Sequence, residues 1–222
     1  EKDGAMINRL GFNNDGVEIV SKRIANNKPK GILGINIGPN KDTENKEEDF
    51  FICLSKLYLH ADYITINISS PNTEGLRDFH EHKALSSLLT RITKLKKEKK
   101  ISKPLLVKIS PDINDRNISE VIELIIKHKI EGIIISNTSD RTRENLIDNQ
   151  KNEKGGLSGK PIKEISTVMI KKFYKEIRKK IPIIGVGGVD SADSAFEKII
   201  AGANAVQLYT SMVYKGPGVV RD

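Results

Sequence analysis

The sequence contains one cysteine and no tryptophan among its 222 residues. The single thiol, Cys53, cannot form an internal disulfide and has no cysteine or histidine partner at the spacing of a metal site. The sequence therefore predicts neither a disulfide scaffold nor a metal centre. Because Cys53 lies in an apolar helical stretch, we expect it to be buried in the core.

Long apolar runs are also lacking. No stretch reaches the roughly 20 residues that a membrane-spanning helix needs, and no secretory signal follows Glu1. The composition, 37% hydrophobic and 30% charged, is typical of a globular protein. We expect one domain over residues 1–222, and the start without methionine suggests part of a longer gene product.

The net charge is +8. A nucleic-acid-binding protein usually gathers such charge on one face. Here the basic residues are spread along the chain, with one local run from Lys94 to Lys100. We interpret that run as the solvated end of a helix, so the sequence favours no nucleic-acid partner.

Six short runs rich in β-branched residues alternate with longer amphipathic stretches, a pattern typical of strands buried on both faces. The predicted strands are residues 31–37, 62–68, 105–110, 132–136, 182–187 and 204–209. The predicted helices include residues 47–59, 83–100, 118–129, 166–179 and 192–201. Ser191 is the expected N-cap of the last helix, and Gly202 its expected end.

This alternation predicts an α/β fold with a parallel sheet and right-handed crossovers. An open doubly wound sheet and a (β/α)8 TIM barrel both fit. A barrel needs eight strands, so two would be missing, and we expect strands 1 and 2 to precede residue 1. Residues 216–222 predict the start of a final helix. Residues 5–14 are too polar for a strand, and residues 137–159 predict a long functional loop.

Polar side chains follow the predicted strands where each one ends. Carboxamides dominate, at Asn36, Asn67, Asn72 and Asn137. The carboxyl ends of parallel strands meet at one rim, and a carboxamide both donates and accepts hydrogen bonds. Such a ring suits a small planar ligand such as a pyrimidine. For the serine, proline and asparagine of residues 69–72, an ordinary turn is the alternative.

Lys108 stands inside an apolar strand. An unpaired buried ammonium is costly, so we expect an anionic or strongly polar partner, with a structural salt bridge as the alternative. Gly188 lies between a predicted strand and the helix capped by Ser191. Its amide, with that of Gly159, could bind a phosphate, and tight-turn glycines are the alternative.

Eight motifs together resemble dihydroorotate dehydrogenase, the flavin enzyme of pyrimidine synthesis. They are INRLGFNN, GINIGPNK, ADYITINISSPNTEGLR, LLVKISPD, GIIISNTS, GGLSGKP, PIIGVGGV and AGANAVQLYTSMVYKGP. They occur in the family's order over nearly the whole chain. The resemblance implies a partial catalytic barrel that binds FMN and oxidises dihydroorotate to orotate.

The resemblance also implies residue roles. Ser70 would take a proton from C5 of dihydroorotate, Thr73 and a water would carry it onward, and Lys108 would stabilise negative charge on the flavin. The implied substrate contacts are Asn8, Arg9, Leu10, Gly11, Phe12, Asn67, Asn72, Asn137 and Thr138. The implied FMN contacts are Asn36, Asn67, Lys108, Ser136, Gly159, Gly188, Tyr209 and Thr210.

A serine at position 70, where soluble classes carry cysteine, points to the membrane-associated class that uses quinone. The resemblance thus implies quinone as a partner and a location at the bacterial inner membrane, on its cytoplasmic face, or at the mitochondrial inner membrane. The membrane contact would come from an amino-terminal helical pair absent here. Two alternatives remain: another FMN-dependent barrel reductase acting on a pyrimidine, and a flavin-free, phosphate-binding aldolase or isomerase barrel.

Overall fold

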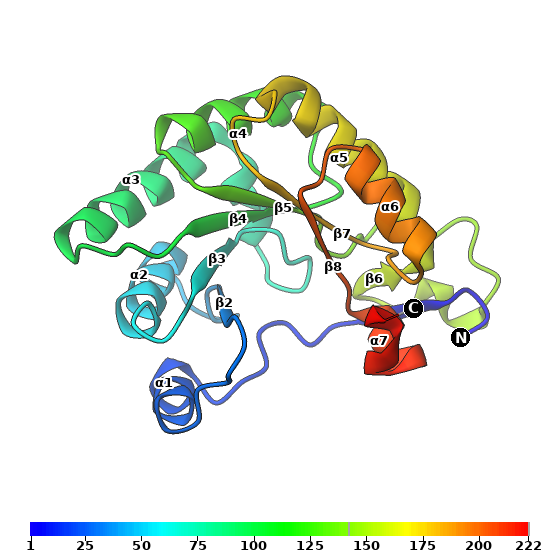
Figure 1. The fold of residues 1–222 in the computed structure, drawn as a ribbon, viewed down its shortest axis with the longest axis horizontal. Helices are drawn as coiled ribbons and strands as arrows, with labels where there is room; N and C mark the ends of the chain where they lie inside the picture. Colours follow the sequence, from blue (N-terminus) through cyan, green and yellow to red (C-terminus); the bar gives the residue numbers. More distant parts are fainter. Residues whose placement is uncertain (142, 222) are drawn as a thin grey trace.

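The computed structural model of the protein describes residues 1–141 and 143–221, and its centre is a parallel, curled sheet (Figure 1). Its strands, in spatial order, are β2 (Gly34–Ile37), β3 (Tyr63–Asn67), β4 (Leu105–Ile109), β5 (Gly132–Ile135), β7 (Ile183–Val186) and β8 (Ala205–Gln207). Each lies within one of the six predicted strand ranges. Their spatial order follows the chain without a reversal.

Helices connect these strands and cover the outer face of the sheet. They are α2 (Lys46–Leu57), α3 (His82–Glu98), α4 (Asp115–Lys127), α5 (Lys163–Ile177) and α6 (Ala192–Ile200). Each overlaps a predicted helix, and successive helices contact one another. Because right-handed crossovers without a reversal put every helix on one face, the fold is a partial (β/α) barrel and not a doubly wound sheet.

The buried strands carry the apolar residues that their sequences predicted. Ile64 and Ile66 of β3 and Ile133 and Ile135 of β5 are fully buried in one core that the helices share. Both faces of a parallel sheet are covered, so nearly continuous apolar strands are stable there. Cys53 differs from the expectation, since it is half-buried against this core.

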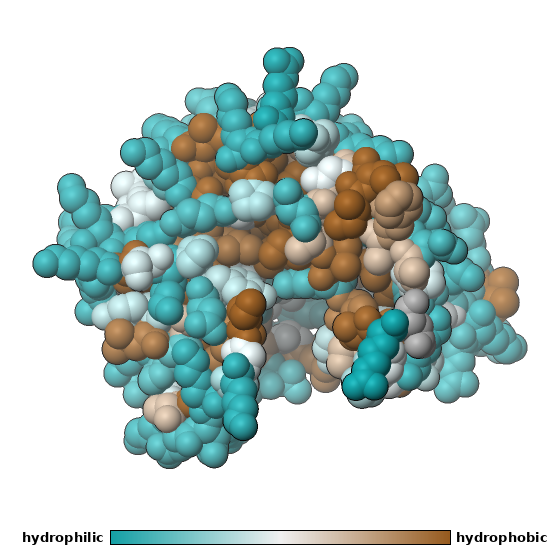
Figure 2. Space-filling model, in the orientation of Figure 1, coloured by the Kyte–Doolittle hydropathy of each residue, from teal (hydrophilic) through white to brown (hydrophobic). Residues whose placement is uncertain are grey.

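The helix ends show why α6 lies where the sequence placed it. Ser191 forms a capping box with Ser194, as expected of an N-cap, since each side chain accepts from the other residue's backbone N–H. Gly202 follows the helix with φ +117°, a conformation that other residues rarely adopt. The exposed side of α6 is apolar, with Phe196, Ile199 and Ile200 on the surface (Figure 2).

The prediction for residues 5–14 was also wrong. Residues 5–14 were expected to contain no strand, but β1 (Ala5–Asn8) pairs antiparallel with β6 (Gly156–Gly159). All four residues of β1 are half-buried, so the strand lacks the alternation that marks a surface strand. Its partner lies about 150 residues away along the chain, and the local sequence therefore carries no signal for it.

The remaining elements are short, except for α1 (Val17–Asn26), which was not predicted and packs beside α2. The predicted loop at 137–159 contains η2 (Asn149–Asn152) as well as β6. The other short helices are η1 (Leu76–His80), η3 (Lys160–Ile162), α7 (Thr210–Lys215) and η4 (Pro217–Val220). The expected final helix begins as η4, and Asp222 lies outside the described residues. Within the described ranges, no helix is both long and apolar enough to cross a membrane.

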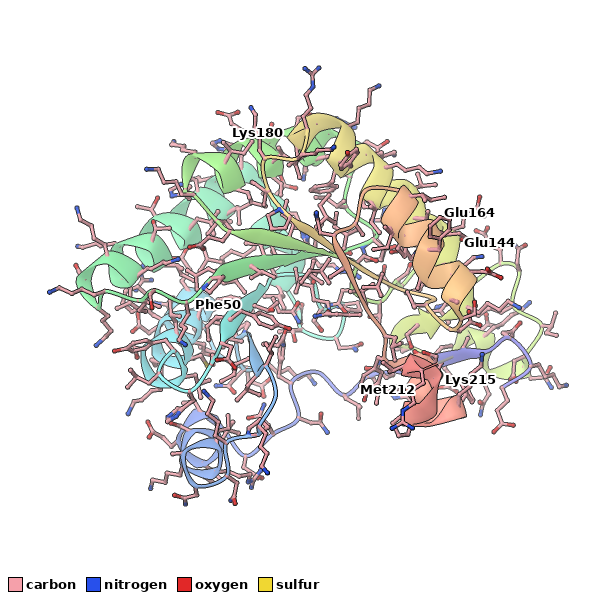
Figure 3. The ribbon with its side chains drawn as sticks, in the orientation of Figure 1. Phe50, Glu144, Glu164, Lys180, Met212 and Lys215 are labelled. Carbon is pink, nitrogen blue, oxygen red and sulfur yellow. The ribbon has the colours of Figure 1, made fainter. Side chains whose placement is uncertain are left out.

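The packing of α2 gives a test of the fold. Phe50 (labelled in Figure 3) is fully buried, and its ring meets that of Phe79 edge-on at 5.9 Å between centroids. We expect Phe50→Ala to lower the free energy of unfolding by about 3–5 kcal/mol, because it leaves a cavity. Ile52→Ala on the same helix, at a side chain 40% exposed, is the control and should cost about 0.5 kcal/mol or less. Denaturant titration measures both, and equal losses would contradict this packing.

Candidate active site

A cavity of about 970 Å³ lies at the carboxyl ends of the strands. Its wall includes Lys108 of β4, residues 136–138 after β5, residues 187 and 188 after β7, and residues 207–211 from the end of β8 onward. Residues of β1 and β6 complete it on the other side. The size is at the upper end of the range for cofactor and ligand pockets in proteins.

Lys108 is the cation that the sheet itself contributes to this cavity. It lies opposite Asn67 in the β3–β4 register and opposite Ile134 in the β4–β5 register. Burial lowers the pKa of its ammonium to about 8. Among residues 1–141 and 143–221, no carboxylate pairs with it and no side chain accepts a hydrogen bond from it. The structural salt bridge, which was the alternative, is therefore absent among the described residues, and none of them supplies the expected anionic or polar partner.

Two carboxamides beside Lys108 are held in fixed orientations. The side-chain oxygen of Asn67, Oδ1, accepts from the Ser69 hydroxyl at 2.8 Å and from the Asn137 Nδ2 at 3.2 Å. The Asn137 Oδ1 accepts from the backbone N–H of Thr138 at 2.8 Å. Asn137 and Thr138 line the cavity. Asn67 at the end of β3 and Asn137 in the loop after β5 are therefore joined into one polar group beside the cavity.

A second polar group joins the loop after β3 to β1. The Ser70 Oγ accepts from the Asn72 N–H at 3.2 Å, and Ser70 is 7% exposed. The Asn72 Nδ2 donates to the backbone oxygen of Asn8 at 3.0 Å and to its Oδ1 at 3.2 Å. Asn8 lines the cavity. Ser70 thus lies at the same end of the sheet as Lys108, connected to the cavity wall through Asn72 and Asn8.

The other end of the cavity is built from glycines and hydroxyls. Gly188 has φ +70° and Gly159 has φ +94°, and a Cβ on either would overlap with neighbouring atoms. Both line the cavity with Tyr209 and Thr210. The Thr210 hydroxyl donates to the Ser158 Oγ at 2.8 Å. Bare amides near the start of α6 form a surface that suits a phosphate.

The cavity gathers most of the predicted site residues and leaves several outside its wall. Those that line it are Asn8, Leu10, Gly11, Lys108, Ser136, Asn137, Thr138, Gly159, Gly188, Tyr209 and Thr210. Those that do not are Arg9, Phe12, Asn36, Asn67, Ser70, Asn72 and Thr73. Asn67, Ser70 and Asn72 are linked to lining residues by the hydrogen bonds above.

The more distant ones lie in other surroundings. Arg9 lines a neighbouring hollow of about 700 Å³, which shares Asn8 and Leu10 with the first, and pairs with Glu153 at 3.1 Å. Asn36 is exposed on β2, an edge of the sheet. Phe12 lies against Gly38, and Thr73 is buried.

The sequence reasoning missed some lining residues. Gln207 of β8 and Lys215 of α7 line the cavity, and the Lys215 ammonium donates to the Asp190 carbonyl at 2.7 Å (Figure 3). Gln207 lies in a motif already noted, at a strand's carboxyl end, which could have marked it. Lys215 lies in the same motif, but not at the end of a predicted strand. In the part of the chain that the structure describes, no cluster of three or more His, Cys, Asp or Glu could hold a metal ion.

Comparison with solved structures identifies the same fold. Dihydroorotate dehydrogenase of Eimeria tenella in complex with ferulenol matches with a TM-score of 0.93 and 35% identity, covering 99% of this chain and 65% of that one. The ligand-free form of that enzyme also matches with a TM-score of 0.93.

Comparison with curated sequences agrees. "Dihydroorotate dehydrogenase (quinone)" of Idiomarina loihiensis is 46% identical over 100% of this chain and 68% of its own length. The protein of the same name from Bartonella tribocorum is 44% identical over 99% of this chain and 62% of its own. The chain thus spans about two thirds of these relatives' lengths. The family model for dihydroorotate dehydrogenase matches residues 1–222, and the chain belongs to the dihydroorotate dehydrogenase family.

Proposed function

We propose that this chain is most of the catalytic barrel of an FMN-dependent enzyme that oxidises dihydroorotate to orotate and passes the electrons to a quinone, in pyrimidine synthesis. The observation that carries the proposal is Lys108, a cation that faces a large cavity with no protein anion beside it among the described residues. The names of similar relatives, with their quinone acceptor, support the reaction.

The residues present suit FMN. The cavity has a cation at Lys108 and amides near Gly159 and Gly188, so it offers one site for a flavin ring and one for a phosphate. Asn36, Asn67, Ser136, Tyr209 and Thr210 complete the proposed contact set. FMN supplies the hydride acceptor when it is bound. Lys108 would stabilise the negative charge that arises beside it.

The carboxamides would hold the substrate. Asn67 and Asn137 bond to one another, as do Asn72 and Asn8, so their remaining donors and acceptors have fixed directions. A planar ring with alternating C=O and N–H groups matches such an array. Thr138 completes this set, and Arg9, Leu10, Gly11 and Phe12 form the neighbouring segment. Prearranged polar groups reduce the cost of orienting a substrate.

Ser70 would remove the proton at C5. An alcohol is a weak base near neutral pH, so a serine needs an onward acceptor for the proton. Thr73, buried three residues away, could pass it through a water to solvent. The Asn72 N–H already donates to the Ser70 oxygen, which fixes the hydroxyl's position.

We place the whole protein at a membrane, the bacterial inner membrane on its cytoplasmic side or the mitochondrial inner membrane, where quinones dissolve. The contact would come from a segment outside this chain. This part of the proposal rests on the family resemblance and on the quinone in the relatives' names.

Ser70→Ala tests the assigned base. Removing the hydroxyl should slow anaerobic reduction of the bound flavin by dihydroorotate by about 10²–10⁴-fold, since general base catalysis supplies that much. The loss of flavin absorbance in a stopped-flow instrument measures the rate. Ser102→Ala, on an exposed loop residue, should change nothing. Reduction at the unsubstituted rate in Ser70→Ala would remove Ser70 from the mechanism.

Lys108→Met tests the charge stabilisation. The substitution keeps the length of the side chain and removes its charge, so flavin reduction should slow by about 10²–10³-fold. Lys103→Met is the matched control, because Lys103 lies before β4 at the opposite end of the strand, 3.9 Å from Asp62. The same assay applies, and equal rates in both variants would contradict the role of Lys108.

The pKa of Lys108 gives a prediction about pH. Burial lowers it to about 8, so in the FMN-free protein the ammonium should lose its proton as the pH rises through about 8. Reaction of Lys108 with an amine-acylating reagent, followed by peptide mass spectrometry, should show that midpoint, and added FMN should protect the amine. Lys198 also has its pKa lowered to about 8 but is fully buried, and should stay unmodified. A Lys108 midpoint near 10.5, the usual lysine value, would show that the cavity does not desolvate it.

A further inference from the structure

Arg77 lies behind the cavity wall, in the η1 segment after β3. It does not line the cavity, and its side chain is 23% exposed. The loop between β3 and η1 carries Ser69, Ser70 and Asn72. Any group that fixes this loop also fixes Ser70.

Two backbone carbonyls accept hydrogen bonds from the Arg77 guanidinium. The Nε donates to the Ser69 oxygen at 3.3 Å, and Nη2 donates to the Thr138 oxygen at 3.1 Å. Ser69 directly precedes Ser70, and Thr138 lines the cavity. One side chain therefore joins the loop after β3 to the loop after β5.

Two carboxylates hold the guanidinium in place. Nη2 lies 3.1 Å from the Asp112 Oδ2, and Nη1 lies 2.9 Å from the Asp140 Oδ1. The Asp112 side chain is only 2% exposed, and it also accepts from the Ser139 hydroxyl at 2.6 Å and from the Asp140 N–H at 3.1 Å. Charge-assisted bonds of this kind are shorter and more directional than bonds between neutral groups. Because Asp112 follows β4, the cluster joins the loops after three neighbouring strands.

His80 ties the same segment to β4. Its Nδ1 donates to the Arg77 carbonyl at 2.9 Å, and its Nε2 accepts from the Ser110 N–H at 3.2 Å. Burial lowers the pKa of His80 to about 4, so the ring is neutral near pH 7 and one nitrogen can accept. Ser110 lies two residues after Lys108. The backbone of Arg77 is thus fixed relative to the strand that carries Lys108.

We infer that Arg77 is a positioning residue, which sets Ser70 against Lys108 and Asn137 by joining the loops after β3, β4 and β5 with its planar guanidinium. This inference rests on the proposed function. A lysine keeps the charge, but it lacks the fork that reaches two carbonyls and two carboxylates at once. A small displacement of a reacting group, near 1 Å, can cost about 10²-fold in rate.

Arg91 of α3 offers a matched control. Its Nη1 lies 3.1 Å from the Glu47 Oε2 and its Nη2 lies 2.8 Å from the Glu48 Oε2. The guanidinium therefore also bridges two carboxylates, but it joins α3 to α2, and none of the three residues lines the cavity. Arg91→Lys removes a similar network without touching the loops that carry the site.

The experiment separates the two half-reactions of the FMN-loaded protein. In Arg77→Lys, anaerobic flavin reduction by dihydroorotate should slow by about 10- to 100-fold. Oxidation of dithionite-reduced flavin by a water-soluble quinone should keep its rate, because that step needs no base, and the FMN content should stay at the unsubstituted level. Arg91→Lys should match the unsubstituted protein in all three measurements.

Asp112→Asn provides a second variant should Arg77→Lys fail to fold. It should slow the same half-reaction, and the double variant should lose less than the product of the two single losses, since both act through one cluster. Unchanged flavin reduction in the variants would overturn the positioning role, and so would equal losses in both half-reactions or in FMN content. If dihydroorotate fails to reduce the flavin of the unsubstituted protein, the proposed function itself is wrong.

Discussion

The site is organised around one half-buried charge, the Lys108 ammonium in the middle of an apolar strand. Removing a charge from water without a partner is unfavourable, and its cost falls only where solvent or a ligand can reach it. The residues on either side, Val107 and Ile109, are fully buried in the core. The Lys108 side chain, by contrast, lines the cavity, where solvent or a ligand can reach it. Since no carboxylate in the described part of the chain pairs with it, this cation suits an anionic or electron-rich ligand.

The parallel sheet determines what surrounds that charge. Its register places Asn67 beside Lys108, although the two are about 40 residues apart in the chain. Asn137, in the loop after β5 on the other side of β4, donates a hydrogen bond to Asn67. Strands give this precision because their backbone ladders are rigid, while the loops that follow them need extra ties. Arg77, Asp112 and His80 supply those ties just outside the cavity.

The two ends of the cavity differ in chemistry, which fits a ligand with two unlike parts. One end combines Lys108 with carboxamides in fixed orientations. The other is built from Gly159, Gly188 and the residues after β8, and a Cβ on either glycine would overlap with neighbouring protein atoms. In the proposed function the first end serves the flavin ring and the substrate, and the second serves the phosphate.

The sequence by itself determined the six parallel strands and the five helices that cover them, because burial on both faces demands apolar runs and solvent demands amphipathic helices. It also indicated the end of the sheet where Ser70 and Lys108 lie. Only the tertiary structure decided that β1 pairs with β6, that no carboxylate of residues 1–141 and 143–221 pairs with Lys108, and that Arg77 connects three loops. Each of these depends on residues far apart in the chain, whose proximity no local pattern records.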